Sequence, residues 1–138
     1  MKLKDFDFRI WDGRKYVNNI KGGVYIHKKD TDVKCLNRNQ DCYDYEFQLD
    51  DLDNSNLEIE LFTGLYDKKD KKVYENDIVK VKSLYDYFLA KISIHKEGTF
   101  YFEGKNGDYI GSLIYLVEDE GYTIEAIGNI NENAELLK

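Results

Sequence analysis

Two histidines, His27 and His95, are the side chains of this 138-residue chain best suited to general acid–base catalysis. Each stands at the end of a short apolar run and next to a lysine, where a solvated histidine is ordinary. A hydrolase or transferase needs a nucleophile, a base and an orienting group brought together. Neither histidine has such neighbours in the sequence, which therefore predicts no catalytic residue and a protein that is not an enzyme.

Metal and cofactor sites are also not expected. Cys35 and Cys42 are seven positions apart, and only the two histidines could complete the four nitrogen and sulfur ligands of a zinc site. The segment from Asp50 to Asn56 is rich in carboxylate and amide oxygens, but it lacks the central glycine and terminal glutamate of a calcium-binding EF-hand loop. Gly22-Gly23 lacks the spacing of a phosphate-binding loop. We therefore expect free thiols, no metal and no cofactor.

The charged residues include two groups that could form a polar surface, a glutamate pair and a lysine cluster. Glu58 and Glu60 alternate with apolar residues, which predicts that both lie on the exposed face of a strand. Four lysines, Lys68, Lys69, Lys71 and Lys72, form the main basic concentration, but acidic residues interleave with them. The net charge of −7 opposes phosphate binding in general. We therefore expect a solvated hairpin tip at the lysines, and no nucleic-acid partner.

Short alternating segments separated by glycine and Asx turns dominate the chain. They predict about nine strands and little helix, a pattern typical of sandwiches or small barrels. Polar residues 28–41 suggest a long loop, and residues 43–49 a strand that the acidic run from Asp50 ends. Residues 110–117 fit either a short helix or a buried strand. The expected strands cover residues 6–11, 15–17, 24–27, 43–49, 57–61, 78–81, 88–95, 99–103 and 122–130, the last with a bulge at Gly128.

The composition fits a folded protein outside the membrane. Aromatic residues make up 14% of the chain and charged residues 34%, so the chain is not disordered. No apolar run approaches the roughly 18 residues that a membrane helix needs, and residues 1–8 have no apolar core of a signal peptide. We therefore expect a cytoplasmic protein with no membrane partner.

Three segments resemble the YopX protein family of phages and prophages. The first is the F-R-x-W-D pattern near the N-terminus, the second is T-G-L-x-D followed by I-Y-E-G-D-I-V, and the third is I-G-N-I-x-E-N-P-E-L-L. The matching residues are Phe8, Arg9, Trp11, Asp12, Thr63, Gly64, Leu65, Asp67, Tyr74, Glu75, Asp77, Ile78, Val79, Ile127, Gly128, Asn129, Ile130, Glu132 and Asn133. Because most of them form turns or begin strands, we interpret them as structural.

Asn76, Asp70 and Ala134 depart from the family pattern. Asn76 replaces the usual glycine and Asp70 lies where the family favours Asn-Gly; asparagine and aspartate are the residues after glycine best able to adopt a positive φ. Ala134 replaces a proline, which makes the C-terminal tail less rigid.

The resemblance implies an architecture and a setting without implying a reaction. The implied fold is mainly β, with an N-terminal β-rich region, residues 1–61, joined to a small C-terminal SH3-like barrel, residues 62–138. The two regions could also form one structural unit. The family is biochemically uncharacterised, and its members are expected to self-associate in the cytoplasm of a bacterial host cell.

Three functions stay open at this level. The first is a self-associating binding protein, a homo-oligomer in which exposed tyrosines such as Tyr85, Tyr87, Tyr101 and Tyr109 form the interface. The second is an acidic inhibitor or DNA mimic that binds a host or phage protein, with the aspartates between Asp41 and Asp53 as the surface. The third is a nucleic-acid-binding module centred on the lysine-rich segment.

Overall fold

The computed structural model describes residues 1–17, 24–38, 49–51 and 56–138. The chain forms two compact units. The first, the barrel-side unit, contains Met1–Asp7 and Leu61–Lys138, and the second, the N-terminal unit, contains Phe8–Glu60. β5 (Glu58–Tyr66) begins in the N-terminal unit and continues into the barrel-side unit. The predicted division into domains after residue 61 stays a prediction.

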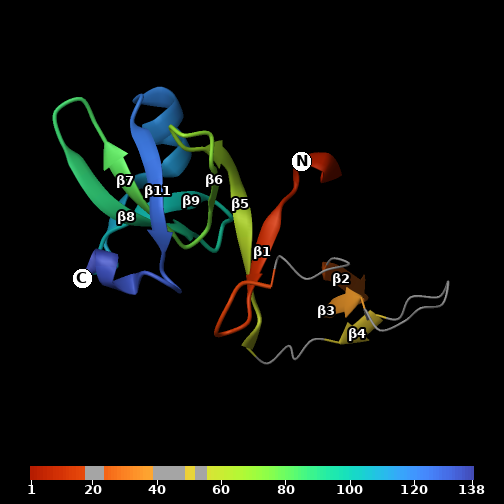
Figure 1. The fold of residues 1–138 in the computed structure, drawn as a ribbon. Helices are drawn as coiled ribbons and strands as arrows, with labels where there is room; N and C mark the ends of the chain where they lie inside the picture. Colours follow the sequence, from red (N-terminus) through yellow and green to blue (C-terminus); the bar gives the residue numbers. More distant parts are fainter. Residues whose placement is uncertain (18–23, 39–48, 52–55) are drawn as a thin grey trace. The chain divides into compact units, whose positions relative to one another are not determined.

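The N-terminal unit is built from short antiparallel strands. They are β1 (Phe8–Trp11), β2 (Val24–Lys29), β3 (Asp32–Arg38) and β4 (Leu49–Asp51), and the last three form a sheet in the order β2-β3-β4 (Figure 1). β1 lies beside β5 in a second sheet, whose order is β1-β5-β6. Ile10, Val17 and Cys35 are buried together, with Phe8, Val24 and Leu57 packed around them.

Two expectations for this unit are wrong. The predicted loop over residues 28–41 is instead a β2–β3 hairpin through residue 38, paired from Val24↔Asn37 to Lys29↔Asp32. Asp30 adopts a φ of 52°, so a single left-handed aspartate replaces the glycine that the hairpin turn would ordinarily require. The strand expected to end at Leu49 also continues further than predicted, because Asp50 and Asp51 pair with β3. Residues 39–41 and 43–48 lie outside the described residues.

The barrel-side unit contains a five-stranded antiparallel sheet. Its strands are β7 (Asp77–Lys82), β8 (Tyr87–Ile94), β9 (Phe100–Glu103), β10 (Tyr109–Ser112) and β11 (Thr123–Asn129), in the order β10-β9-β8-β7-β11. β6 (Lys72–Tyr74) pairs with β5, and short turns η1 (Leu3–Asp5), η3 (Tyr115–Asp119) and η4 (Ala134–Leu137) complete the unit. The predicted hairpin of residues 88–103 is confirmed.

One face of this sheet forms the larger hydrophobic core. Val79, Val81, Ala90, Ile92 and Phe102 have no exposed surface, and Val73, Leu113 and Ile124 join them. Since side chains alternate along a strand, the residues between them lie on the opposite face. The strands and sheets described above make the fold mainly β with little helix, as predicted.

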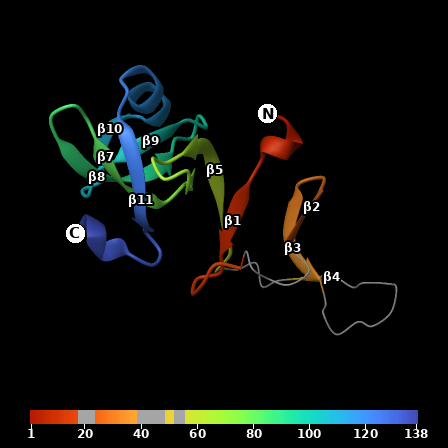
Figure 2. The same cartoon turned by 45° about the horizontal axis from the view of Figure 1, so that its top comes forward.

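The expected SH3-like barrel is not confirmed. No sheet within the described residues closes into a barrel, and β10 and β11 stand at opposite edges of the five-stranded sheet. Residues 110–117 combine both predicted alternatives, because they end β10 and then enter η3, a single π-type turn (Figure 2). η3 connects β10 to β11 along the chain, and these two edge strands do not pair with each other, as closure of the sheet into a barrel would require.

Local turn chemistry follows the sequence closely. Asn76 and Asp70 have φ angles of 68° and 61°, as their replacement of glycine predicts. The bulge predicted at Gly128 is present, since the register of β11 on β7 shifts between Ala126 and Gly128.

Replacing Gly128 by alanine is expected to lower the free energy of unfolding by about 1–3 kcal/mol, the range for an overpacked site. A Cβ at this position would lie 2.7 Å from Oδ1 and 2.9 Å from Cβ of Asn133. Asn133 accepts a hydrogen bond from the backbone of Asn129, so it cannot move without losing that contact. Denaturant unfolding measures the loss. Gly104→Ala is the control for the loss of a glycine, because Gly104 has no positive φ and its Cβ would meet only ordinary contacts, the shortest of them at 3.6 Å.

Candidate functional site

The histidines do not form a catalytic arrangement. His27 is exposed on β2, and His95 is exposed just after β8. The ring of His95 stacks on Tyr101, with centroids 4.1 Å apart. Within the described residues, no group of three His, Cys, Asp or Glu side chains could hold a metal ion.

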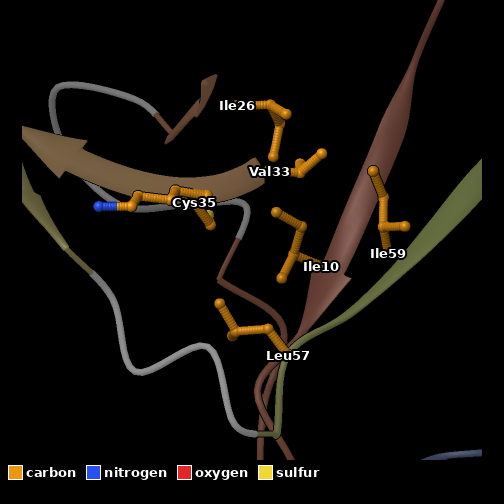
Figure 3. Close-up of a pocket in the computed structure, with 7 residues that line it drawn as sticks. Ile10, Ile26, Val33, Cys35, Leu57 and Ile59 are labelled. Atoms are coloured by element: carbon orange, nitrogen blue, oxygen red, sulfur yellow. The ribbon is translucent and has the colours of Figure 1, made fainter. Parts of the chain in front are cut away.

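Cys35 lies in an apolar pocket of the N-terminal unit. The pocket has a volume of about 200 Å³, and Figure 3 shows the side chains that line it, among them Ile10, Val33 and Ile59. Burial raises the pKa of the Cys35 thiol, which disfavours the reactive thiolate. The Cys35 side chain is buried, and its setting is that of a packed thiol. Cys42 lies outside the described residues, so the expectation of two free thiols stays a prediction.

Glu60 is a buried charge centre, and its predicted exposure is wrong. Its carboxylate has no exposed surface and accepts hydrogen bonds from Arg9 Nε at 2.6 Å and Tyr16 Oη at 2.9 Å. The Arg9 guanidinium also lies 4.7 Å from the centre of the Tyr16 ring. Glu58, in contrast, is exposed as expected. Alternation alone could not reveal that the face carrying Glu60 is covered by a cation and a phenol.

The rest of the N-terminal motif shapes a turn. Trp11 and Tyr16 form an isolated bridge, and their rings meet edge to face at 5.0 Å. Asp12 Oδ1 accepts hydrogen bonds from the backbone N–H groups of Arg14 and Lys15 at 2.7 and 2.8 Å. These bonds lower the pKa of the Asp12 carboxyl, with the Lys15 bond as the largest cause.

Asp67 connects the β5–β6 hairpin tip to β11. Its Oδ1 accepts the backbone N–H groups of Lys69 and Lys71, both at 2.9 Å, and its Oδ2 accepts that of Ala126 at 3.0 Å. The side chain is buried, and desolvation alone would raise its pKa. The N–H donors of Ala126, Lys71 and Lys69 outweigh this effect, so the pKa of Asp67 lies below its usual value.

The lysine-rich tip is largely neutralised within the fold. Lys68 and Lys69 form ion pairs with Glu125 at 3.0 and 2.9 Å, and Lys72 pairs with Asp7 at 2.8 Å. The backbone N–H of Lys68 also donates to Ile124 O. Lys68, Lys69 and Lys71 are exposed, as expected of a solvated tip, but ion pairs also hold the tip to the edge of β11. A nucleic-acid site at these lysines would have to break three ion pairs.

The remaining residues of the central motif also make contacts within the barrel-side unit. Thr63 Oγ1 donates to Val73 O at 2.7 Å, Asp77 Oδ2 accepts the N–H of Tyr74 at 2.8 Å, and the Tyr74 hydroxyl donates to Asp7 at 2.6 Å. Leu65 packs against the larger core, and Ile78 and Val79 have no exposed surface. No sequence pattern indicated a role for Asp7, because its partners Lys72 and Tyr74 lie 65 and 67 positions away.

The C-terminal motif forms a compact turn around Asn129. Its Oδ1 accepts the backbone N–H groups of Asn131 and Glu132, and its Nδ2 donates to Glu132 Oε1 at 2.9 Å. Asn133 Oδ1 in turn accepts the N–H of Asn129. These amides replace helix or strand hydrogen bonds where the chain leaves β11.

The tyrosines proposed for an interface differ in exposure. Tyr85, Tyr87 and Tyr109 are 93%, 56% and 58% exposed, whereas Tyr101 is half-buried. Tyr85 and Tyr87 belong to the β7–β8 hairpin, and Tyr101 and Tyr109 form a separate cluster with His95. The acidic segment Asp41–Asp53 lies mostly outside the described residues, so the inhibitor hypothesis stays a prediction.

Comparisons with known proteins agree with the motif pattern. The YopX protein family model matches residues 7–138. The crystal structure of protein yopX from Bacillus subtilis is similar with a TM-score of 0.64 and 22% identity, covering 95% of this chain and 97% of that one. The crystal structure of protein EF1440 from Enterococcus faecalis is similar with a TM-score of 0.60 and 23% identity, covering 96% of this chain and 98% of that one. No curated protein sequence matches the chain.

These structures share the fold, and at this identity the fold is all that the likeness establishes. Among the residues that the structure describes, no helix has the length and apolarity that crossing a membrane requires. Since the family model spans nearly the whole chain, this protein is a member of the YopX family, whose function is uncharacterised.

Proposed function

We propose that this chain is a non-enzymatic binding protein, encoded by a phage or prophage, that self-associates in the cytoplasm of its bacterial host. The β7–β8 hairpin tip is the observation that carries the proposal. Leu84 and Tyr85 at the tip are 85% and 93% exposed, and the neighbouring Tyr87 is 56% exposed. Grouped large apolar side chains on a protein surface favour an interaction site.

The tip is an ordered turn. Ser83 N–H donates to Asp86 O at 2.9 Å, Asp86 N–H to Ser83 Oγ at 3.3 Å, and Tyr87 N–H to Asp86 Oδ1 at 2.7 Å. Because these bonds fix the backbone, Leu84 and Tyr85 project without a large further loss of chain entropy on binding. Exposed but preorganised apolar side chains of this kind suit the centre of an interface.

Lys80 contacts the ring of Tyr87 near the tip of the hairpin. Lys80 Nζ lies 4.3 Å from the centre of the Tyr87 ring, within the range of a cation–π contact. This contact holds the Tyr87 ring on the sheet face. Leu84, Tyr85 and Tyr87 lie within four positions of one another at this end of the hairpin, and we name them the hairpin patch.

The double replacement of Leu84 and Tyr85 by serine is expected to convert an oligomer into a monomer. Light scattering over a concentration series measures the mass. The unchanged protein should exceed the monomer mass of 16.3 kDa, and the double variant should approach it. Leu3→Ser is the matched control, since Leu3 is 87% exposed but lies in η1, outside the patch. A monomeric mass for the unchanged protein at the highest concentration would contradict self-association.

A further inference from the structure

The outer face of the β8–β10 strands carries a second surface, distinct from the hairpin patch. The ladder pairs Lys91 with Glu103, Ser93 with Tyr101, and Tyr109 with Glu103. Paired residues point to the same side of a sheet, and Ile92 and Phe102 occupy the core side. Lys91, Glu103, Tyr101 and Tyr109 therefore share the face that does not form the hydrophobic core.

Three rings on this face lie close to parallel. His95 and Tyr101 are inclined by 20° at 4.1 Å, and Tyr109 is inclined by 32° to both of them at 5.5 and 5.3 Å. The core pair Phe88–Phe102 is instead perpendicular. His95 and Tyr109 are exposed, so the three rings together have aromatic surface in contact with solvent. We name these three rings the ring cluster.

A pocket with both charged and apolar walls, the latter from Ile130, Ala134 and Leu137, adjoins the ring cluster. It has a volume of about 210 Å³ and is lined by Lys91, Glu103, Lys105 and Lys138, together with the glycine-bearing β9–β10 loop and η4. Glu103 links the two features, since its Oε1 lies 3.4 Å from the Tyr101 hydroxyl while its Oε2 pairs with Lys91 at 2.9 Å. The rings and the pocket are thus contiguous.

The side chains that line the pocket carry more positive than negative charge. Lys91 compensates Glu103, and this ion pair, as the largest cause, lowers the pKa of the Glu103 carboxyl. Lys105 and Lys138 then add two further ammonium groups on the pocket wall, both exposed. On a chain with a net charge of −7, a pocket with three lysines and one carboxylate is a local site for an anion.

We propose that the ring cluster and this pocket bind a nucleotide, with the base stacked on the rings and the phosphate among the lysines. Stacking of a base on an aromatic side chain contributes about 1–3 kcal/mol and does not depend strongly on sequence. A long nucleic acid would meet the repulsion of the whole acidic chain. The ligand is therefore short, either a free mononucleotide or the end of a single strand, and both sources share the same chemistry.

Titration of the ¹⁵N-labelled protein with adenosine 5′-monophosphate, followed by NMR, tests the site. We expect saturable shifts in residues 91–109 and at Lys138. Adenosine and inorganic phosphate alone should each bind more weakly than the nucleotide. A single-stranded oligothymidylate in a parallel titration identifies the source, because tighter binding of either probe assigns the site to a strand end or to a free nucleotide.

Two variants make the test specific. Tyr109→Ala and Lys105→Glu are each expected to weaken binding about tenfold, and both residues are exposed, so folding should be retained. Tyr66→Ala is the matched control for the ring, since Tyr66 is 54% exposed and also touches another ring; Lys15→Glu is the control for charge. The proposal is overturned if neither probe binds, if adenosine binds as well as its phosphate, or if binding survives both variants. Self-association is measured separately and does not bear on this result.

Discussion

Replacing Asp67 by alanine is expected to lower the free energy of unfolding by about 3 kcal/mol or more. The carboxylate accepts three backbone N–H groups, those of Lys69, Lys71 and Ala126. A hydrogen bond to a charged group contributes about 1.5–3 kcal/mol, and the substitution removes three such bonds at once, of which the bonds to Lys69 and Lys71 lie in an exposed turn and count least. It also removes a side-chain contact between the β5–β6 hairpin and β11.

Denaturant unfolding of Asp67→Ala measures this loss, and Asp119→Ala serves as the control. Asp119 is exposed, so its replacement should change stability by no more than about 0.5 kcal/mol. Equal stabilities for the two variants would show that the Asp67 bonds contribute nothing net.

The pH dependence of stability provides a second measurement on the same carboxylate. The pKa of Asp67 is lower in the folded protein than its usual value. Its contribution is therefore present above the unfolded pKa, near 3.9, and is lost as the pH falls through the folded pKa. Asp67→Asn removes this titration, so its stability should decline less steeply than that of the unchanged protein below about pH 5.

Replacing Glu60 by glutamine is expected to destabilise the N-terminal unit by about 3 kcal/mol, the lower part of the range for breaking a buried ion pair. The carboxylate has no exposed surface and receives both the Arg9 guanidinium and the Tyr16 hydroxyl. Glutamine preserves the shape but removes the charge that compensates Arg9 inside the protein.

Glu58→Gln is the matched control for this change. Glu58 lies two residues earlier on the same strand and is exposed, so its replacement should be nearly neutral. Thermal unfolding followed by the fluorescence of Trp11, whose ring contacts Tyr16, reports on this unit directly. A Glu60→Gln protein as stable as Glu58→Gln would contradict the buried-pair interpretation.

The sequence predicted those features that depend on neighbouring residues. Asn76 was expected to hold a positive φ, and Gly128 to mark a bulge; both follow from the conformational preferences of one residue. The β8–β9 hairpin was likewise visible because alternation and a glycine turn lie within a few positions of each other.

The β2–β3 hairpin is one local feature that was missed, whereas the errors at charged residues concern contacts between distant residues. Glu60 was assigned to an exposed face because its partners, Arg9 and Tyr16, lie 51 and 44 positions away. Asp67 was interpreted as a turn former, and its bond to Ala126 spans 59 positions. A local sequence pattern does not show which distant cation or backbone amide will bind a carboxylate. The burial of these two carboxylates could therefore not be predicted from the alternation of polar and apolar residues.

The ring cluster depends instead on the register between successive strands. His95, Tyr101 and Tyr109 belong to three successive parts of the sheet, and each one alone fitted an ordinary surface residue. Their assembly requires the register of β8 on β9 and of β9 on β10. Tyr101 and Tyr109 were predicted as interface residues, but their stacking with a histidine was not.

The position of β11 has a consequence for the order of folding. β7, β8 and β9 follow one another along the chain, so their pairing closes short loops and can form early. β11 pairs with β7 across some forty intervening positions, and it contributes Ile124 to the larger core. Asp67 and Glu125 then bind the β5–β6 hairpin to β11. Docking of β11 should therefore be the late, rate-limiting event, and its detachment the first step of unfolding.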